Sequence, residues 1–62
     1  MSEINKIYHN IKSKCLSIKS AIDLIKETKG EERKELLVLI KKASLELQES
    51  ITLLEKELDN IR

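Results

Sequence analysis

An isoleucine recurs every seven residues through the first half of the chain, and this spacing constrains the fold more than any other feature. The four residues are Ile4, Ile11, Ile18 and Ile25. Residues seven apart lie on the same face of an α-helix, because seven residues make almost two turns. The repeat therefore predicts a long helix over about residues 3–28, with the isoleucines at heptad position a and Ser2 at the N-cap.

Other heptad positions widen this apolar face. Position d holds Ile7, Lys14, Ala21 and Thr28, and position e holds Tyr8, Cys15 and Ile22. Positions a and e are therefore predicted to form the buried stripe, with d apolar only in places. A stripe this wide is typical of a helix inside a four-helix bundle, because a two-stranded coiled coil needs a narrower seam.

A second heptad pattern follows a short break in the sequence. Its position a holds Leu37, Ser44, Ile51 and Leu58, and its position d holds Ile40, Leu47, Leu54 and Ile61. The pattern predicts a second helix over about residues 32–61. The turn is predicted at about residues 29–31, where Gly30 can take the left-handed conformation that ends a helix. Residues 1–62 thus form one all-α domain, an antiparallel helical hairpin.

The composition agrees with a helical hairpin that associates. The chain has 62 residues, no Pro, one Gly, no Phe or Trp, and 37% charged residues. Two helices cover each other along one seam only, so a lone hairpin with stripes this wide leaves apolar surface in water. A second copy, giving a homodimeric four-helix bundle, is the simplest remedy. A hairpin excised from a larger bundle is the alternative.

Charge and cysteine content exclude several classes of function. A net charge of +1 gives no global indication of nucleic acid or membrane binding. The single cysteine, Cys15, cannot form an internal disulfide and is interpreted as a small core residue. There is no Cys/His cluster for a metal site, so neither metal nor cofactor is predicted. No apolar run approaches the ~18 residues of a membrane span, and a cytoplasmic location is expected.

The only histidine, His9, occupies position f, on the opposite side of the predicted helix from the apolar stripe. It is therefore predicted to be exposed, with Ser13 one turn and Leu16 two turns further along the same face. Three lysines surround this surface: Lys6, Lys12 and Lys19. An exposed imidazole on a basic helix face is a candidate nucleophile or partner-binding site.

The segment His9-Asn10-Ile11-Lys12-Ser13 resembles the H-box of the dimerisation and histidine-phosphotransfer (DHp) domain of bacterial sensor histidine kinases. That motif reads roughly His, acidic residue, aliphatic, basic, Thr/Ser/Asn, Pro, aliphatic; His9, Ile11, Lys12 and Ser13 match it. The resemblance implies that His9 accepts a phosphoryl group and that Ser13 positions water for dephosphorylation of a partner. The implied partner is a response-regulator receiver or a histidine kinase domain, docked through Lys6, Lys12, Leu16 and Lys19.

Two positions depart from the motif. Lys14 stands where the family usually has proline, and Asn10 stands where an acid commonly serves as the base. An amide can orient an imidazole by hydrogen bonding but cannot take its proton. The chain also has no Gly-rich loop to cradle nucleotide phosphates, so it is not expected to act as a kinase on its own. Phosphoryl relay through His9 remains chemically possible.

Three other interpretations fit the same residues. His9 could be an ordinary surface histidine on a bundle. The hairpin could be a non-catalytic adaptor or inhibitor that binds a histidine kinase or another bundle by helix packing. It could also be a small dimeric RNA-binding bundle of the plasmid copy-control type, although the near-zero net charge makes nucleic acid a poor expectation.

Overall fold

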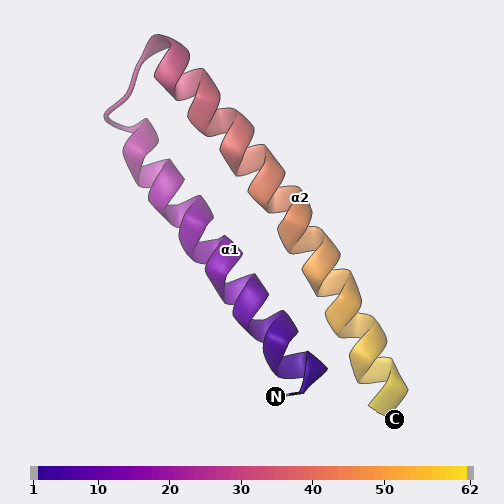
Figure 1. Cartoon of the computed structure of the whole chain (residues 1–62). Coiled ribbons are helices and arrows are strands. Elements are labelled where there is room, and N and C mark those ends of the chain that lie inside the picture. Colours follow the sequence, from indigo (N-terminus) through magenta and orange to yellow (C-terminus); the bar gives the residue numbers. More distant parts are fainter. Residues whose placement is uncertain (1, 62) are drawn as a thin grey trace.

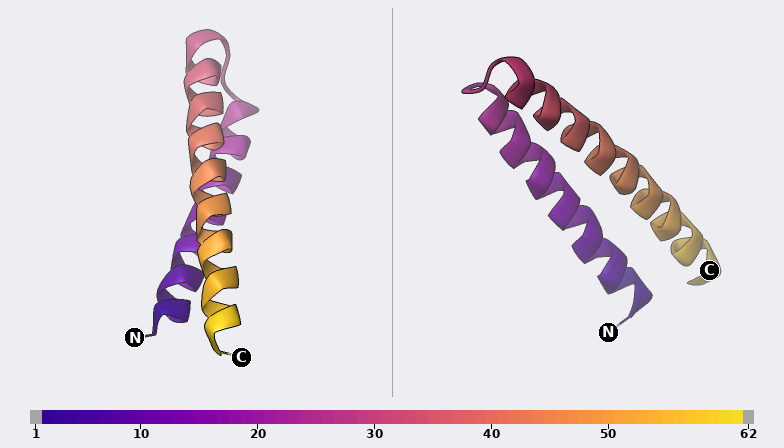
Figure 2. Two further views of the ribbon diagram at one scale, coloured as in Figure 1. Left: turned by 90° about the vertical axis from the view of Figure 1, so that its right-hand side faces the viewer. Right: turned by 45° about the horizontal axis from the view of Figure 1, so that its top comes forward.

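The computed structural model describes residues 2–61, which form two antiparallel helices joined by a short turn (Figure 1). Helix α1 spans Glu3–Ile25 and helix α2 spans Gly30–Ile61. The hairpin is 49 Å along its longest axis, and both ends of the chain lie opposite the turn. The predicted all-α hairpin is confirmed. Turned views show that the two helices cross at a shallow angle (Figure 2).

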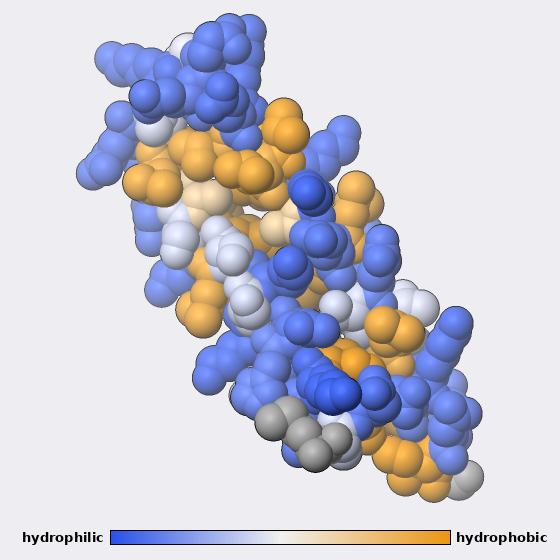
Figure 3. Space-filling model, viewed as in Figure 1, coloured by the Kyte–Doolittle hydropathy of each residue, from blue (hydrophilic) through white to orange (hydrophobic). Residues whose placement is uncertain are grey.

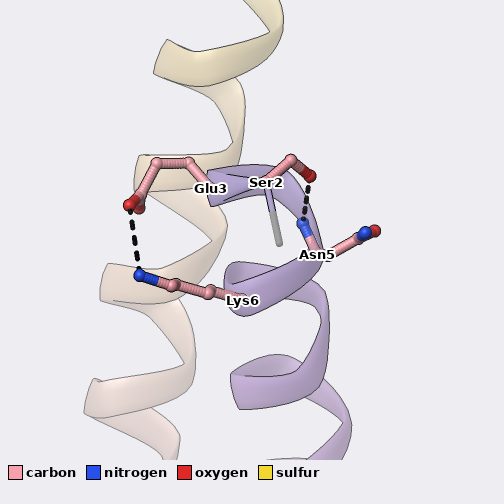
Figure 4. Close-up of polar contacts among 4 residues, drawn as sticks. All are labelled: Ser2, Glu3, Asn5 and Lys6. Carbon is pink, nitrogen blue, oxygen red and sulfur yellow. Dashed lines mark hydrogen bonds and ion pairs between the residues drawn. The ribbon is translucent and has the colours of Figure 1, made fainter.

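Ser2 begins α1 as an N-cap. Its hydroxyl oxygen accepts a hydrogen bond from the backbone N–H of Asn5 at 3.2 Å (Figure 4). Glu3 follows in the first turn, where a negative charge is favourable, and its carboxylate lies 3.9 Å from the Lys6 amine. Both side chains are more than 60% exposed, so this ion pair stabilises the helix only weakly. The predicted N-cap is confirmed.

The C-terminus of α1 lies at Ile25, three residues before the predicted end. The backbone N–H of Glu27 donates to the carbonyl of Leu24 at 3.0 Å, which tightens the last turn. The Thr28 hydroxyl and the Arg33 guanidinium each donate to the Ile25 carbonyl at 3.3 Å. A threonine hydroxyl competes with the helical hydrogen bond, and Arg33 reaches back from α2, so the helix stops here.

Gly30 has a φ of 61°, so the predicted left-handed conformation is confirmed. The prediction that Gly30 ends the first helix is wrong, because Gly30 is the first residue of α2. Residues 26–29 connect the two helices, and the positive φ of Gly30 lies at the point where α2 begins. Glu31 and Glu32 then follow in the first turn of α2, where the helix dipole favours negative charge.

The two helices meet through positions a and d of α1 and positions d and g of α2. The partly or fully buried residues are Ile4, Ile7, Ile11, Lys14, Ile18, Ala21, Ile25 and Thr28 up to the turn, and Leu36, Ile40, Ala43, Ser44, Glu46, Leu47, Ser50, Leu54 and Glu57 in α2. Among residues 2–61 only Ile7, with 4% of its surface exposed, is fully buried. In the single hairpin the covered stripes therefore differ from the predicted ones. One neighbouring helix covers only part of a wide apolar face, which leaves position e of α1 and, apart from Ser44, position a of α2 exposed.

Lys14 lies within this apolar seam and pairs across it. Its amine is 3.2 Å from a carboxylate oxygen of Glu46 in α2, and 34% of the Lys14 side chain is exposed. A half-buried ammonium group needs such a partner, because moving an unpaired charge out of water is costly. The pair places Lys14 and Glu46 at about the same level of the two antiparallel helices. Tyr8 then lies near the level of Ile51, and Ile22 near the level of Leu37.

Ile7→Ala is expected to lower the free energy of unfolding by roughly 2–4 kcal/mol, because it removes most of a buried side chain and leaves a cavity. The matched control is Val38→Ala, since Val38 is 66% exposed. That change is expected to stay within about 0.5 kcal/mol of the parent. Urea unfolding followed by circular dichroism at one fixed protein concentration measures both. Equal losses in the two variants would contradict this account of the seam.

Gly30→Ala is expected to cost roughly 1–2 kcal/mol of unfolding free energy, because an L-alanine is strained at positive φ. A Cβ at this position meets no atom within 4 Å, so the cost comes from the backbone alone. Gly30→Asn should lose less, since asparagine tolerates the left-handed region better than alanine. The same unfolding experiment checks this order, and alanine performing as well as asparagine would refute it.

Candidate functional site

His9 lies on the outward side of α1, opposite the seam, and its side chain is exposed as predicted. It borders a groove that runs along α1 toward the turn and reaches the first half of α2. We call this the His9 groove; its main lining residues are His9, Lys12, Ser13, Leu16, Leu24 and Leu39. The groove thus brings together four of the predicted site residues, namely His9, Lys12, Ser13 and Leu16.

Leucines make the groove apolar toward the turn. Leu16, Leu24 and Leu39 are each more than half exposed. Figure 3 shows apolar surface extending across both helices near the turn, with paler and more polar surface beyond it. Ser13 and Ser17 give the floor small polar side chains near His9. A neighbouring molecule would therefore meet an imidazole and hydroxyls at one end and an apolar surface at the other.

The charges around the groove differ between its two ends. The amine of Lys12 lies with His9 at one end. Near the turn, Glu32 and Glu35 border the apolar surface formed with Leu24 and Leu39. The groove therefore favours a partner that carries negative charge where it approaches His9.

Three of the predicted site residues lie outside this groove. Lys6 pairs with Glu3 near the start of α1, and Lys19 and Asn10 are exposed but are not among the residues that line the groove. Within residues 2–61, neither His9 nor Asn10 takes part in a side-chain hydrogen bond or an ion pair. Asn10 therefore does not orient the imidazole here, although its amide could do so chemically.

The imidazole contacts an aromatic ring instead. The rings of Tyr8 and His9 have their centroids 5.6 Å apart and their planes 64° apart, which is an edge-to-face arrangement. Such geometry is favourable because the positive edge of one ring meets the negative face of the other. Tyr8 is thus part of the surroundings of His9, a role that the heptad pattern alone did not indicate.

A second apolar surface runs along the opposite side of the hairpin from the groove. Its residues occupy position e of α1 and position a of α2, and all but the partly buried Ser44 are exposed: Tyr8, Cys15 and Ile22 from α1, and Leu37, Ser44, Ile51 and Leu58 from α2. In α1 the groove takes positions on one side of the a/d seam, so position e falls on the other. In α2 Leu39 marks the groove side, so position a falls opposite it. We call this surface the Tyr8 flank.

The Tyr8 flank is apolar along most of the hairpin and lacks a partner within the described chain. Its large residues are between 43% and 55% exposed, and Cys15 is exposed as well. Cys15 is thus exposed in the single hairpin, and its interpretation as a core residue of a four-helix bundle stays a prediction. Cys15 and Ser44 lie at about the same level, so the smallest side chains of the flank sit midway along it.

Two searches of the described residues bear on other functions. No group of three or more His, Cys, Asp or Glu side chains is arranged to hold a metal ion. Neither of the two helices is long and apolar enough to cross a membrane.

Sequence reasoning missed Leu24, Leu39 and Tyr8 as parts of the site. Leu24 and Leu39 belong to different helices, and only the antiparallel register places them side by side. The Lys14–Glu46 pair that joins the helices at one level could not be chosen from the sequence, since both helices carry many charges. Comparisons with protein-family models, curated proteins and solved structures found no match for this chain.

Proposed function

We propose that this chain is a dimerising histidine-phosphotransfer hairpin of two-component signalling, with His9 as the phosphoacceptor. The observation that carries the proposal is that exposed apolar residues lie on the Tyr8 flank as well as in the groove that His9 borders. By helix geometry the flank lies on the opposite side of the seam from the groove. Association through the flank therefore leaves His9 and the groove free to meet a receiver domain.

The dimer follows from what the Tyr8 flank requires. A two-fold axis parallel to the helices places position e of α1 against position a of α2 in a second copy. Ile22 then packs near Leu37 of the second copy, and Tyr8 near its Ile51. Each of these side chains is about half exposed in one hairpin, and burying the remainder stabilises the pair through the hydrophobic effect. The product is a symmetric four-helix bundle.

The chemistry at His9 is nucleophilic attack on a receiver's aspartyl phosphate. The lone pair of an unprotonated imidazole nitrogen forms the P–N bond as the acyl-phosphate P–O bond breaks. The electron pair leaves with the receiver carboxylate, and the proton on the other ring nitrogen passes to water. Lys12 lies beside this position and complements an acidic receiver pocket. The reverse transfer returns the phosphoryl group to the receiver.

Neighbouring side chains support relay more than phosphorylation from ATP. Asn10 cannot take a proton from the imidazole, so a strong general base is missing from the position next to His9. Ser13, one turn away in the same groove, has a hydroxyl that can hold a water molecule for dephosphorylation. Leu16 offers an exposed apolar anchor for the receiver.

A non-catalytic adaptor is the second candidate, and Leu24 and Leu39 favour it. These two leucines extend the groove well beyond His9 and give it an apolar surface suited to helix packing. Binding of a helical partner that survives His9→Ala but is lost in Leu24→Lys would support the adaptor over phosphoryl transfer.

The phosphoryl-transfer proposal predicts an acid-labile label at His9. Receiver domains from the source organism, each charged with acetyl phosphate, are mixed with the hairpin, and the label is located by mass spectrometry. We expect one or more receivers to label the parent chain and none to label His9→Gln. Leu16→Ala should weaken the productive receiver's binding by about tenfold, equal to about 1.4 kcal/mol. Failure of every receiver, or unchanged labelling of His9→Gln, would overturn the proposal.

The dimer proposal predicts that the reactivity of the Cys15 thiol depends on protein concentration. Cys15 lies on the Tyr8 flank, so association should protect it from a thiol reagent such as Ellman's reagent. Ile22→Lys should keep the chain monomeric, at 7.2 kDa by sedimentation, with a reactive thiol at every concentration.

The matched control for this experiment is Leu24→Lys, which alters a similarly exposed residue on the groove side. It should leave both the dimer and the thiol protection intact. A parent chain that stays monomeric, or dissociation caused by Leu24→Lys and not by Ile22→Lys, would show that the flank is not the dimer surface.

A further inference from the structure

We infer that Tyr8 is a positioning residue for His9 and that it couples the orientation of the imidazole to dimerisation. This inference rests on the proposed function, because it concerns the same phosphoacceptor. It adds a regulatory element: the state of the Tyr8 flank determines how His9 is held.

The ring contact itself restricts both side chains. Consecutive residues of a helix project about 100° apart, so their side chains do not face each other by default. Tyr8 and His9 nevertheless place their ring centroids 5.6 Å apart, within the range of favourable aromatic pairs. Each ring must therefore lean toward the other, and this selects particular rotamers for both.

Nothing else among the described residues holds the imidazole. His9 has no hydrogen bond or ion pair within residues 2–61, and its outer side opens onto the groove. In-line phosphoryl transfer needs the attacking nitrogen aligned with the phosphorus, so a freely rotating ring reacts more slowly. The Tyr8 ring supplies that alignment.

Tyr8 also belongs to the surface that a second copy covers. It is 55% exposed in the single hairpin, so its ring is free to leave the contact with His9. Packing against a second copy limits the rotamers of Tyr8, and through the ring contact it limits those of His9. The dimer is then the form with the aligned phosphoacceptor, and the monomer is the form with the mobile one.

The first test uses the fact that His9 is the only histidine in the chain, so its ring protons are assigned directly in a proton NMR spectrum. Three forms are compared: the parent, Tyr8→Phe, which keeps the ring, and Tyr8→Leu, which keeps an apolar group without a ring. We expect the ring-current shift of the His9 protons to persist in Tyr8→Phe and to vanish in Tyr8→Leu. We also expect it to weaken on dilution and in Ile22→Lys.

This spectrum tests the contact between Tyr8 and His9 and its coupling to dimerisation, and it needs no phosphoryl donor. Equal His9 shifts in all three forms would refute the ring contact. A shift that is unchanged by dilution across the dimer transition, and unchanged in Ile22→Lys, would refute the coupling to dimerisation. Sedimentation of Tyr8→Leu at the same concentration confirms that it remains dimeric.

The second test measures the rate of transfer from the receiver that labels the parent chain. Loss of alignment should lower the maximal rate in Tyr8→Leu by roughly two- to tenfold, the range expected for one aromatic pair. The receiver concentration at half-maximal rate should stay unchanged, and Tyr8→Phe should match the parent. If a receiver labels the parent chain and Tyr8→Leu shows no loss of rate, the positioning role of Tyr8 is refuted and the proposed function is not. A parent that no receiver labels would refute the proposed function instead.

Discussion

Each helix of this hairpin carries more apolar surface than one neighbouring helix can cover, and the rest of the structure depends on that excess. The seam uses positions a and d of α1 and positions d and g of α2, and it fully buries only Ile7 among the described residues. Many of the remaining apolar residues lie on the Tyr8 flank and in the His9 groove, and others, such as Leu45 and Leu53, lie elsewhere on α2. A hairpin with so small an enclosed core gains stability from further burial, and the proposed dimer would supply it.

The division of this excess between two sides gives the hairpin its proposed activity. One surface can serve association while the other stays open to a partner, so the phosphoacceptor need not be uncovered before it reacts. The rotation of the two helices about the seam assigns residues to the two surfaces. Tyr8 is the residue through which we propose that the two surfaces are coupled, since it belongs to the flank and its ring contacts His9. In this account, dimerisation and phosphoryl transfer are linked through one aromatic contact.

The sequence predicted the architecture well because periodicity and capping are local properties. The isoleucine heptad, the Ser2 cap and the exposure of His9 follow from residues close together in the chain, and the structure agrees with each. The end of α1 was misplaced because the Arg33 guanidinium that caps it comes from the other helix.

The buried stripe of α1 was predicted at positions a and e, whereas α2 covers positions a and d, for a related reason. A heptad pattern shows all the apolar positions of a helix, but it does not show which of them the first neighbour covers. That choice depends on the rotation and level of α2 against α1. The groove was only partly predicted for the same reason. Four of its residues lie on one helix, namely His9, Lys12, Ser13 and Leu16. Leu39 lies on the other helix and joins them only through tertiary packing.

The most direct test of the account is an isotope-filtered NOE experiment on a dimer formed from labelled and unlabelled copies. The account predicts contacts between copies that join Ile22 to Leu37 and Tyr8 to Ile51, with no such contacts at Leu16 or Leu24. Intermolecular contacts centred on Leu16 and Leu24 would place the second copy over His9. That result would contradict both the proposed dimer and the open phosphoacceptor.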